Sequence, residues 1–153
     1  MARSFFDTSA LVKYYHPEPG TESIDRLINE PGAELVISRL TLVETTSVFA
    51  TKVRTATFDA AHFARLRGRF ASDVSRKRYQ VIRLLNSHYD RAQDLIRSHG
   101  LTRQIRTLDA LQLAVALNLH LEAPLDFFVC ADHRLCSLAI SEGLAVINPE
   151  TAS

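Results

Sequence analysis

Short apolar runs separated by longer stretches of helical periodicity dominate the pattern of hydrophobic and polar positions. The runs cover residues 3–6, 34–37, 79–84, 126–130 and 144–147, and each has the length and apolar content of a β-strand. Helical segments are expected in every gap between them. Alternation of strands and helices along one chain predicts an α/β fold of three layers, in which a mainly parallel sheet of about five strands is flanked by helices.

Proline and glycine mark the boundaries of these elements. Breaker residues separate the expected helices and strands at Pro17, Pro19, Gly20, Pro31, Gly32, Pro124 and Pro149. Asn86 or Ser87 is expected to cap a helix that ends at Gly100, because glycine tolerates the left-handed conformation that follows many helices.

The composition is that of an ordinary globular domain. Of the 153 residues, 46% are hydrophobic and 23% are charged, which suits one compact domain over residues 1–150. No apolar run reaches the roughly eighteen residues of a membrane-spanning helix. The N-terminus lacks the basic stretch and long apolar region of a signal peptide. We therefore expect a cytoplasmic protein that makes no contact with a membrane.

Cysteine and histidine residues form no recognisable metal or nucleophile motif. Cys130 and Cys136 lie on an expected strand and the next helix, with no second pair to complete a zinc site. Both are expected to be buried as small apolar residues. None of the six histidines has the H-E-x-x-H spacing, and all are expected at the surface or at edges of the fold. They are His16, His62, His88, His99, His120 and His133.

Two aspartates follow apolar strands directly. Asp7 ends the run Ser4-Phe5-Phe6 and opens a helical segment, and Asp132 stands between the strand at 126–130 and the next helix. In open α/β sheets, ligands bind outside the carboxyl ends of the strands, where the direction of winding switches. Both carboxylates are therefore expected at the functional edge of the sheet.

Two further acids lie on expected helices. Asp109 belongs to a segment that is apolar nearly all round, which is typical of a buried helix. A buried carboxylate is costly unless it is paired or binds a cation. Alternatively, Thr107 caps this helix and Asp109 is a first-turn acid favoured by the helix dipole. Glu44 lies in an amphipathic segment, and this segment taken alone favours an exposed glutamate without a function.

The net charge of +1 conceals a strong asymmetry. Residues 52–106 carry thirteen Lys and Arg against four Asp and Glu, a net charge of +9, and the rest of the chain carries −8. This basic middle segment contains Arg65, Arg67 and Arg69. It either steers a polyanion toward the acidic residues or forms the solvated faces of helices.

Four segments together resemble the successive motifs of PIN-domain ribonucleases. They are Phe5–Leu11 (FFDTSAL), Ser38–Glu44 (SRLTLVE), Arg106–Ala114 (RTLDALQLA) and Val129–Leu135 (VCADHRL). Within that family, the length of the chain and the wording of the motifs are similar to the VapC toxins of type II toxin–antitoxin systems. The resemblance covers essentially the full chain, and the first and third motifs are its most specific parts.

The resemblance implies a PIN fold with an acidic pocket that binds Mg²⁺ or Mn²⁺. Asp7, Glu44, Asp109 and Asp132 match the four acids of the family in order. Ser9 matches a small hydroxyl residue that hydrogen-bonds a carboxylate or a water on the metal, and Arg106 is expected to contact a substrate phosphate. His133 is a departure, because it replaces the generic polar residue expected after the fourth acid. The implied partners are an RNA substrate, a cognate antitoxin and a second copy of the chain.

The residue types suit this chemistry independently of the resemblance. Mg²⁺ prefers oxygen ligands, and one or two such ions activate water for attack on a phosphodiester without a nucleophilic side chain. The sequence therefore predicts a metal-dependent endoribonuclease. An alternative is a catalytically inactive PIN-like module that binds RNA or protein, although a pure binder has no need for carboxylates that repel phosphate. A receiver-like domain is disfavoured, because it requires adjacent acids after its first strand and a lysine after its last.

Overall fold

The computed structural model describes residues 1–152 and contains five strands and seven helices within that range. The strands are β1 (Arg3–Phe6), β2 (Glu34–Ser38), β3 (Gln80–Ile82), β4 (Phe127–Val129) and β5 (Val146–Ile147). The helices are α1 (Thr8–Tyr15), α2 (Thr21–Asn29), α3 (Leu40–Arg54), α4 (Ala60–Ser75), α5 (Asn86–His99), α6 (Thr107–Glu122) and α7 (His133–Ser141). Helices occupy every gap between strands, as the pattern predicts.

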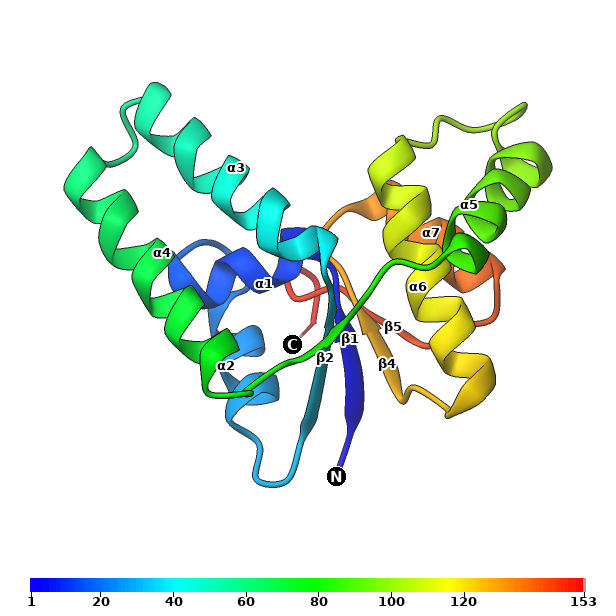
Figure 1. Cartoon of the computed structure of the whole chain (residues 1–153), viewed down its shortest axis with the longest axis horizontal. Coiled ribbons are helices and arrows are strands. Elements are labelled where there is room, and N and C mark those ends of the chain that lie inside the picture. Colours follow the sequence, from blue (N-terminus) through cyan, green and yellow to red (C-terminus); the bar gives the residue numbers. More distant parts are fainter. Residues whose placement is uncertain (153) are drawn as a thin grey trace.

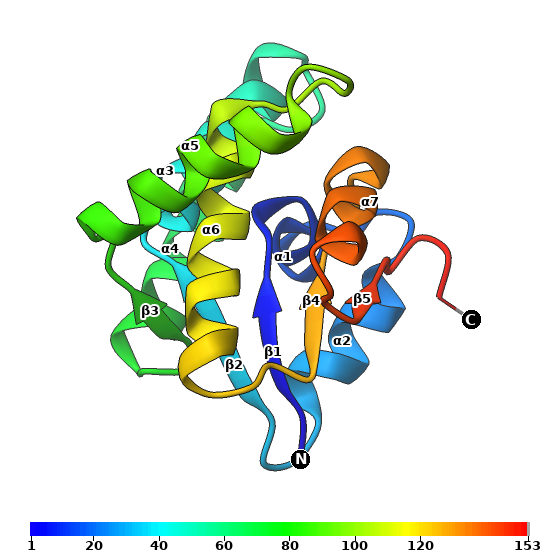
Figure 2. The same ribbon diagram turned by 90° about the vertical axis from the view of Figure 1, so that its right-hand side faces the viewer.

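All five strands are parallel and lie in the order β3-β2-β1-β4-β5 (Figure 2). The chain winds outward from β1 to β2 and β3, then returns to place β4 on the other side of β1. In the register of the sheet, Phe5 lies beside Val36 of β2, and Phe6 lies beside Val129 of β4. The winding therefore changes direction between β1 and β4, which is the place where open parallel sheets bind ligands.

The sheet separates two apolar layers, because successive side chains on a strand point to opposite faces. Phe5, Val36 and Phe128 belong to the cluster formed with α5, α6 and α7. Their neighbours Phe6, Ile37 and Val129 belong to the cluster formed with α1, α2, α3 and α4. Burial on both faces explains why the strands read as continuous apolar runs in the sequence, and the expected three-layer α/β fold is confirmed.

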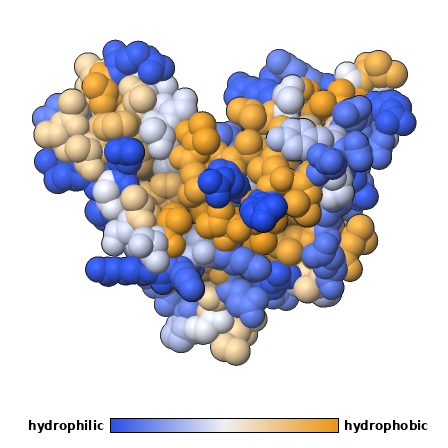
Figure 3. All heavy atoms as spheres, in the orientation of Figure 1, coloured by the Kyte–Doolittle hydropathy of each residue, from blue (hydrophilic) through white to orange (hydrophobic). Residues whose placement is uncertain are grey.

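Two pairs of helices rise beyond the carboxyl ends of the strands (Figure 1). Helices α3 and α4 form one arm, and α5 with the first turns of α6 forms the other. The space-filling view shows a notch between these arms (Figure 3). No helix within residues 1–152 combines the length and the apolar character needed to cross a bilayer.

Several boundaries differ from the expectations. Helix α5 begins one residue after Leu85, whose backbone N–H donates to His88 Nδ1 at 2.9 Å, so neither Asn86 nor Ser87 is the N-cap. His88 is consequently buried rather than at the surface. Gly100 has a right-handed φ of −69°, because a 3₁₀-like turn continues the chain and no left-handed cap forms.

The break between α1 and α2 does require a glycine. Gly20 has φ +94°, and a Cβ at this position would lie 2.9 Å from the carbonyl carbon of Pro149. Only glycine combines the left-handed backbone with this close approach of the C-terminal segment. The expected breaks at this turn and at Pro31-Gly32 are both confirmed.

Candidate active site

Asp7 and Asp132 are the N-caps of the helices that follow two adjacent strands. Asp7 Oδ2 accepts from the backbone N–H of Ser9 at 3.1 Å, and Asp132 Oδ1 accepts from that of Leu135 at 3.0 Å. The Asp7 N–H donates to Val129 O at 2.9 Å, so the end of β1 is tied to the end of β4. The two carboxylates therefore lie on either side of the topological switch point.

Ser9 connects these two strand ends through its hydroxyl group. Its Oγ donates to Asp7 Oδ2 at 2.6 Å and accepts from the backbone N–H of Ala131 at 3.1 Å. The hydrogen bond to a carboxylate that was expected of Ser9 is thus present. Cys130 is buried beside it, with Sγ 3.8 Å from both Ser9 Oγ and Asp7 Oδ2, which agrees with the expectation that this cysteine is a small buried residue.

Glu44 reaches the same region from α3 and is held by a buried polar network. Gln112 Nε2 donates to Glu44 Oε1 at 2.7 Å, and Thr8 Oγ1 donates to the same oxygen at 3.1 Å. Gln112 is fully buried, and its Oε1 accepts from Ser38 Oγ at 2.8 Å while its Nε2 also contacts Thr41 Oγ1 at 2.8 Å. One amide therefore links β2, α3 and α6 to a single carboxylate oxygen.

Asp109 is the third residue of α6 and lies in its first turn, and Arg106 is the N-cap of this helix. Thr107 is the first residue of the helix and is not its cap. Within the part of the chain that the structure describes, the Asp109 carboxylate accepts no hydrogen bond. Asp7 Oδ1, Glu44 Oε2 and Asp132 Oδ2 likewise accept none from residues 1–152, so each carboxylate keeps at least one free oxygen.

Burial and mutual repulsion shift the pKa values of three of these acids upward. Burial raises the pKa of Asp7 from 3.8 to about 6; the Ser9 hydroxyl opposes this rise, and the Glu44 charge adds to it. Burial also raises the pKa of Asp109 from 3.8 to about 6, helped by the charges of Asp7 and Asp132 and opposed by Arg106.

The third shifted acid is Glu44. Burial is the main cause of its raised pKa, the donors Gln112 and Thr8 oppose the shift, and the Asp109 charge increases it. Asp7, Glu44, Asp109 and Asp132 therefore lie close enough for their charges to interact, while their role as metal ligands stays a prediction.

The donor set of this group suits a hard divalent cation. It contains carboxylate oxygens only, and oxygen ligands are those that Mg²⁺ and Mn²⁺ prefer. As the side chains stand, however, no three His, Cys, Asp or Glu residues within 1–152 are spaced to coordinate one ion. The free oxygens and the raised pKa values are the observations that fit a cation, which would reverse the repulsion between the acids.

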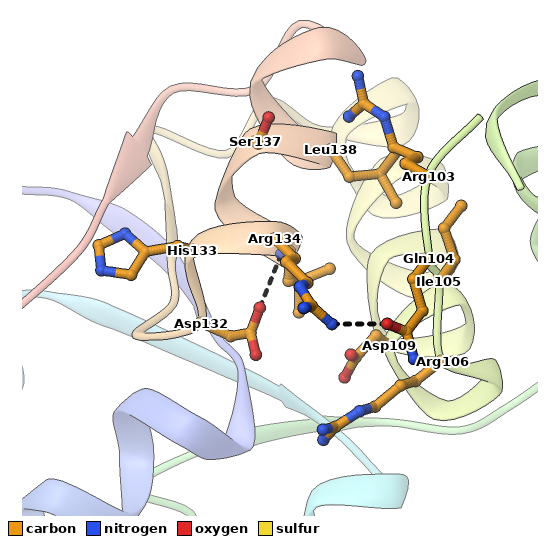
Figure 4. A pocket seen from close by; sticks show the side chains of 11 residues that line it. Arg103, Gln104, Ile105, Arg106, Asp109, Asp132, His133, Arg134, Ser137 and Leu138 are labelled. Atoms are coloured by element: carbon orange, nitrogen blue, oxygen red, sulfur yellow. Dashed lines mark hydrogen bonds between the residues drawn. The ribbon is translucent and has the colours of Figure 1, made fainter.

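A pocket of about 660 Å³ opens beside Asp109 and Asp132 (Figure 4). It lies between the loop at residues 103–106 and helix α7. Arg106, Arg103 and Arg134 line it, and Arg134 Nη1 donates to Gln104 Oε1 at 2.8 Å. His133 points away from the two acids in Figure 4, and its Nδ1 lies 3.5 Å from Asn148 Nδ2; within residues 1–152 it makes no hydrogen bond to the four carboxylates.

Two parts of this site were not predicted from the sequence. Gln112 is one, and its signal was that it is the single amide in the apolar first half of α6, one turn after Asp109. Arg134 is the other, and no periodicity distinguishes it from a surface arginine. Their contacts depend on partners that lie 74 and 30 residues away in the chain.

The basic middle segment does not form one continuous surface. Arg65, Arg67 and Arg69 lie on α4, whereas Arg103 and Arg106 lie in the pocket on the opposite arm (Figure 1). Arg69 stacks on the ring of Tyr15 with its guanidinium carbon 5.6 Å from the centroid, and Arg97 pairs with Asp94 at 2.6 Å. Part of the positive charge therefore serves packing and local pairing.

Several solved structures share the fold of this chain over nearly its whole length. VapC20 of Mycobacterium tuberculosis, described as a sarcin–ricin loop cleaving toxin, superposes with a TM-score of 0.67 at 15% identity, covering 95% of this chain and 99% of that chain. FitAcB of Neisseria gonorrhoeae gives 0.67 at 17% identity, with 97% and 99% covered. A toxin–antitoxin complex of Klebsiella pneumoniae gives 0.62 at 18% identity, with 95% and 97% covered.

At these identities the structural relatives show the fold alone. A comparison with curated protein sequences finds no match. The PIN domain family, however, matches residues 4–146, which is nearly the whole chain. The resemblance stated from the four motifs is thereby confirmed, and the chain belongs to the PIN domain family, a family of nucleases that is typically metal-dependent.

Proposed function

We propose that this protein is a metal-dependent endoribonuclease that acts as a toxin on cellular RNA and is neutralised by a cognate antitoxin. One observation carries the proposal. Four carboxylates from different elements lie at the switch point of the sheet with interacting charges, and each keeps an oxygen that no donor within residues 1–152 contacts. A group that served only to cap helices would not need Glu44, which caps nothing.

Asp7, Glu44, Asp109 and Asp132 would hold Mg²⁺ or Mn²⁺ through their free oxygens. When bound, one or two such ions lower the pKa of water and neutralise charge on the phosphodiester that is cut. Ser9 fixes the orientation of Asp7, and Gln112 with Thr8 fixes that of Glu44. Arg106 lines the pocket without a side-chain hydrogen bond to the other described residues, and it would contact a substrate phosphate.

The toxin role is supported by the kind of proteins that share the fold. Solved relatives include a toxin and a structure described as a toxin–antitoxin complex. Apolar side chains are also exposed where a partner can cover them, as the central face in Figure 3 shows. Val43 and Tyr89 are exposed, and both line a groove of about 330 Å³ between α3 and the start of α5. We assign this face to the second copy in a homodimer.

Cleavage by the purified protein tests the activity. Wild type is expected to cut single-stranded RNA in Mg²⁺ or Mn²⁺ and to leave it intact in EDTA. Asp7→Asn is expected to abolish cutting, while the exposed Asp90→Asn on α5 retains it. Cleavage by wild type in EDTA would contradict a metal-dependent mechanism.

Expression in cells tests the toxin role separately. Induction of wild type is expected to arrest growth and to create new RNA ends, whereas Asp7→Ala should do neither. Coexpression of the product of an adjacent small reading frame should restore growth. Identical growth and identical end maps for wild type and Asp7→Ala would exclude a toxin that acts as a nuclease.

A further inference from the structure

The pocket beside Asp109 and Asp132 has a composition that the carboxylate group does not explain. Its walls come from the loop at residues 103–106 and from α7, and the two acids occupy only one edge (Figure 4). A volume of about 660 Å³ is within the range of pockets that enclose a small ligand. The pocket is therefore large enough for more than a metal ion and its waters.

Cationic and apolar groups face each other across this pocket. Arg103, Arg106 and Arg134 supply guanidinium groups, and Ile105 and Leu138 supply apolar surface. Guanidinium groups bind phosphate with a planar pair of N–H donors and also stack on nucleobases. The guanidinium groups therefore suit the phosphate and the base of a nucleotide, and the apolar surface suits the face of the base.

Away from the edge formed by Asp109 and Asp132, the charged hydrogen-bonding groups of the pocket are all donors, namely Arg103, Arg106 and Arg134. Arginine side chains have no acceptor, and Gln104 Oε1 is already occupied by Arg134 Nη1 at 2.8 Å, which leaves the Gln104 amide as a donor. A base that binds these arginines therefore has to offer acceptors. Guanine offers two adjacent ones, O6 and N7, to which arginine binds in a bidentate manner.

We propose that this pocket binds an unpaired guanine nucleotide of the RNA strand, directly beside the phosphodiester that the carboxylate group cuts. This inference rests on the proposed nuclease function and adds its substrate specificity. The nucleotide has to be unpaired, because the base enters a pocket and the deep major groove of duplex RNA does not expose its edge to side chains. Arg134, held by Gln104, reads the base, while Arg103 and Arg106 contact phosphate.

Binding in EDTA tests the pocket without requiring cleavage. The probes are a fluorescein-labelled oligouridine and the same oligouridine with one guanine, compared by fluorescence anisotropy. Wild type is expected to bind the guanine-containing RNA on the order of 10-fold more tightly, which is the discrimination typical of one bidentate arginine contact. Arg134→Lys keeps the charge but loses the planar fork, so it should bind both RNAs equally.

Two further variants separate pocket filling from general charge. Ser137→Phe, on the exposed side of the pocket, should fill the space and also remove the preference, although every charge remains. Arg26→Gln on α2, far from the pocket, should keep the preference. Equal binding of the two RNAs by wild type, or a guanine preference that survives in both pocket variants, would overturn the inference.

Cleavage of a random-sequence RNA pool in Mn²⁺ tests the guanine pocket and the nuclease function separately, so that failure of one can be told from failure of the other. Wild type should cut next to guanine, and Arg134→Lys should cut without that preference. Asp7→Asn should not cut but should still prefer guanine in EDTA. Cutting without any base preference at the flanking positions overturns the pocket assignment alone, whereas guanine binding without cutting overturns the nuclease function and leaves the pocket.

Discussion

Asp109 is the site residue whose environment is least explained by local structure. Its carboxylate is partly buried, accepts no hydrogen bond from the described residues, and lies within the field of Asp7 and Asp132. Its position in the first turn of α6 gains only about 0.3–1 kcal/mol from the helix dipole. Ionised Asp109 therefore costs stability at neutral pH unless a cation is bound.

Replacing Asp109 by asparagine separates function from stability. Asp109→Asn is expected to abolish cleavage while leaving the metal-free protein as stable as wild type or more stable, since one repelling charge is removed. Mg²⁺ or Mn²⁺ should raise the melting temperature of wild type and raise that of the variant less, because only folded protein binds the ion. Thermal melting with and without metal measures this. A variant that cuts at the wild-type rate would show that the chemistry belongs to other residues.

The raised pKa of Asp7 predicts how stability depends on pH. Its pKa is about 6 in the folded protein against 3.8 normally, so protonation favours the folded state. This stabilisation is complete below pH 3.8 and is lost as the pH rises through about 6. Between pH 7 and pH 5 the metal-free wild type should gain about 1 kcal/mol more than Asp7→Asn. Urea unfolding at both pH values measures the free energy of unfolding of each protein. If wild type and Asp7→Asn gained the same stability between pH 7 and pH 5, the raised pKa of Asp7 would be contradicted.

Gln112 is expected to control metal affinity through Glu44. Gln112→Leu removes the donor at 2.7 Å from Glu44 Oε1, and loss of a hydrogen bond to a metal ligand commonly weakens metal binding by about 10–100-fold. Mn²⁺ titration measures this effect separately from stability. Asn118→Leu, on the same helix and partly exposed, is the matched control and should bind Mn²⁺ as wild type does. Unchanged Mn²⁺ affinity in Gln112→Leu would mean that the network is structural only.

Helix α4 presents arginines that can bind RNA together, at a distance from the acidic residues. It carries Arg65 and Arg67 on one arm of the notch, opposite the arm that holds the pocket. An RNA strand that crosses the notch would meet both arms. Arg69 has a packing role against Tyr15 and is best left unchanged in any test of the helix.

Charge reversal on α4 tests this role. Arg65→Glu combined with Arg67→Glu should weaken RNA binding and flatten its salt dependence, because each lost phosphate contact removes about 0.7 from the slope for single strands. Anisotropy titrations over a range of salt concentrations measure both quantities, with Arg26→Glu on α2 as the control. If RNA affinity, antitoxin affinity and salt slope all remain those of wild type, the helix presents only a solvated face.

The whole molecule presents an acidic centre between two arms that are partly basic and partly apolar. An inhibitor can exploit the same centre as the metal does. An arginine of the antitoxin is the suitable group, because its planar fork pairs with carboxylates in a bidentate manner. Such an arginine would occupy the free oxygens of the acids in place of the cation.

Competition between antitoxin and Mg²⁺ is therefore expected. Titrating Mg²⁺ into the preformed complex should lower the apparent antitoxin affinity, and the loss should be smaller with Asp109→Asn. Isothermal titration calorimetry of antitoxin binding at several Mg²⁺ concentrations measures the effect. Antitoxin affinity that is independent of Mg²⁺ would exclude inhibition through the acidic centre.

The sequence by itself determined the architecture and the positions of the acids. Short runs rich in apolar residues located all five strands, and the central ones are the clearest because strands buried on both faces have to be apolar, whereas the edge strand β3 is partly exposed. Their position after strands placed Asp7 and Asp132 at the carboxyl edge of the sheet, whereas Asp109 became a candidate only together with its match to the third family motif. These features are local, so a pattern of neighbouring residues encodes them.

Only the tertiary structure decided the strand order and the surroundings of the acids. The order β3-β2-β1-β4-β5 creates the switch point, and it depends on which strands pair across more than a hundred residues of chain. The hydrogen bond from Gln112 to Glu44 joins residues that are 68 positions apart in the chain. The hydrogen bond from Arg134 to Gln104 forms only when α7 packs beside the loop before α6. The raised pKa values of Asp7 and Asp109 arise from burial and from distant charges, which no local pattern contains.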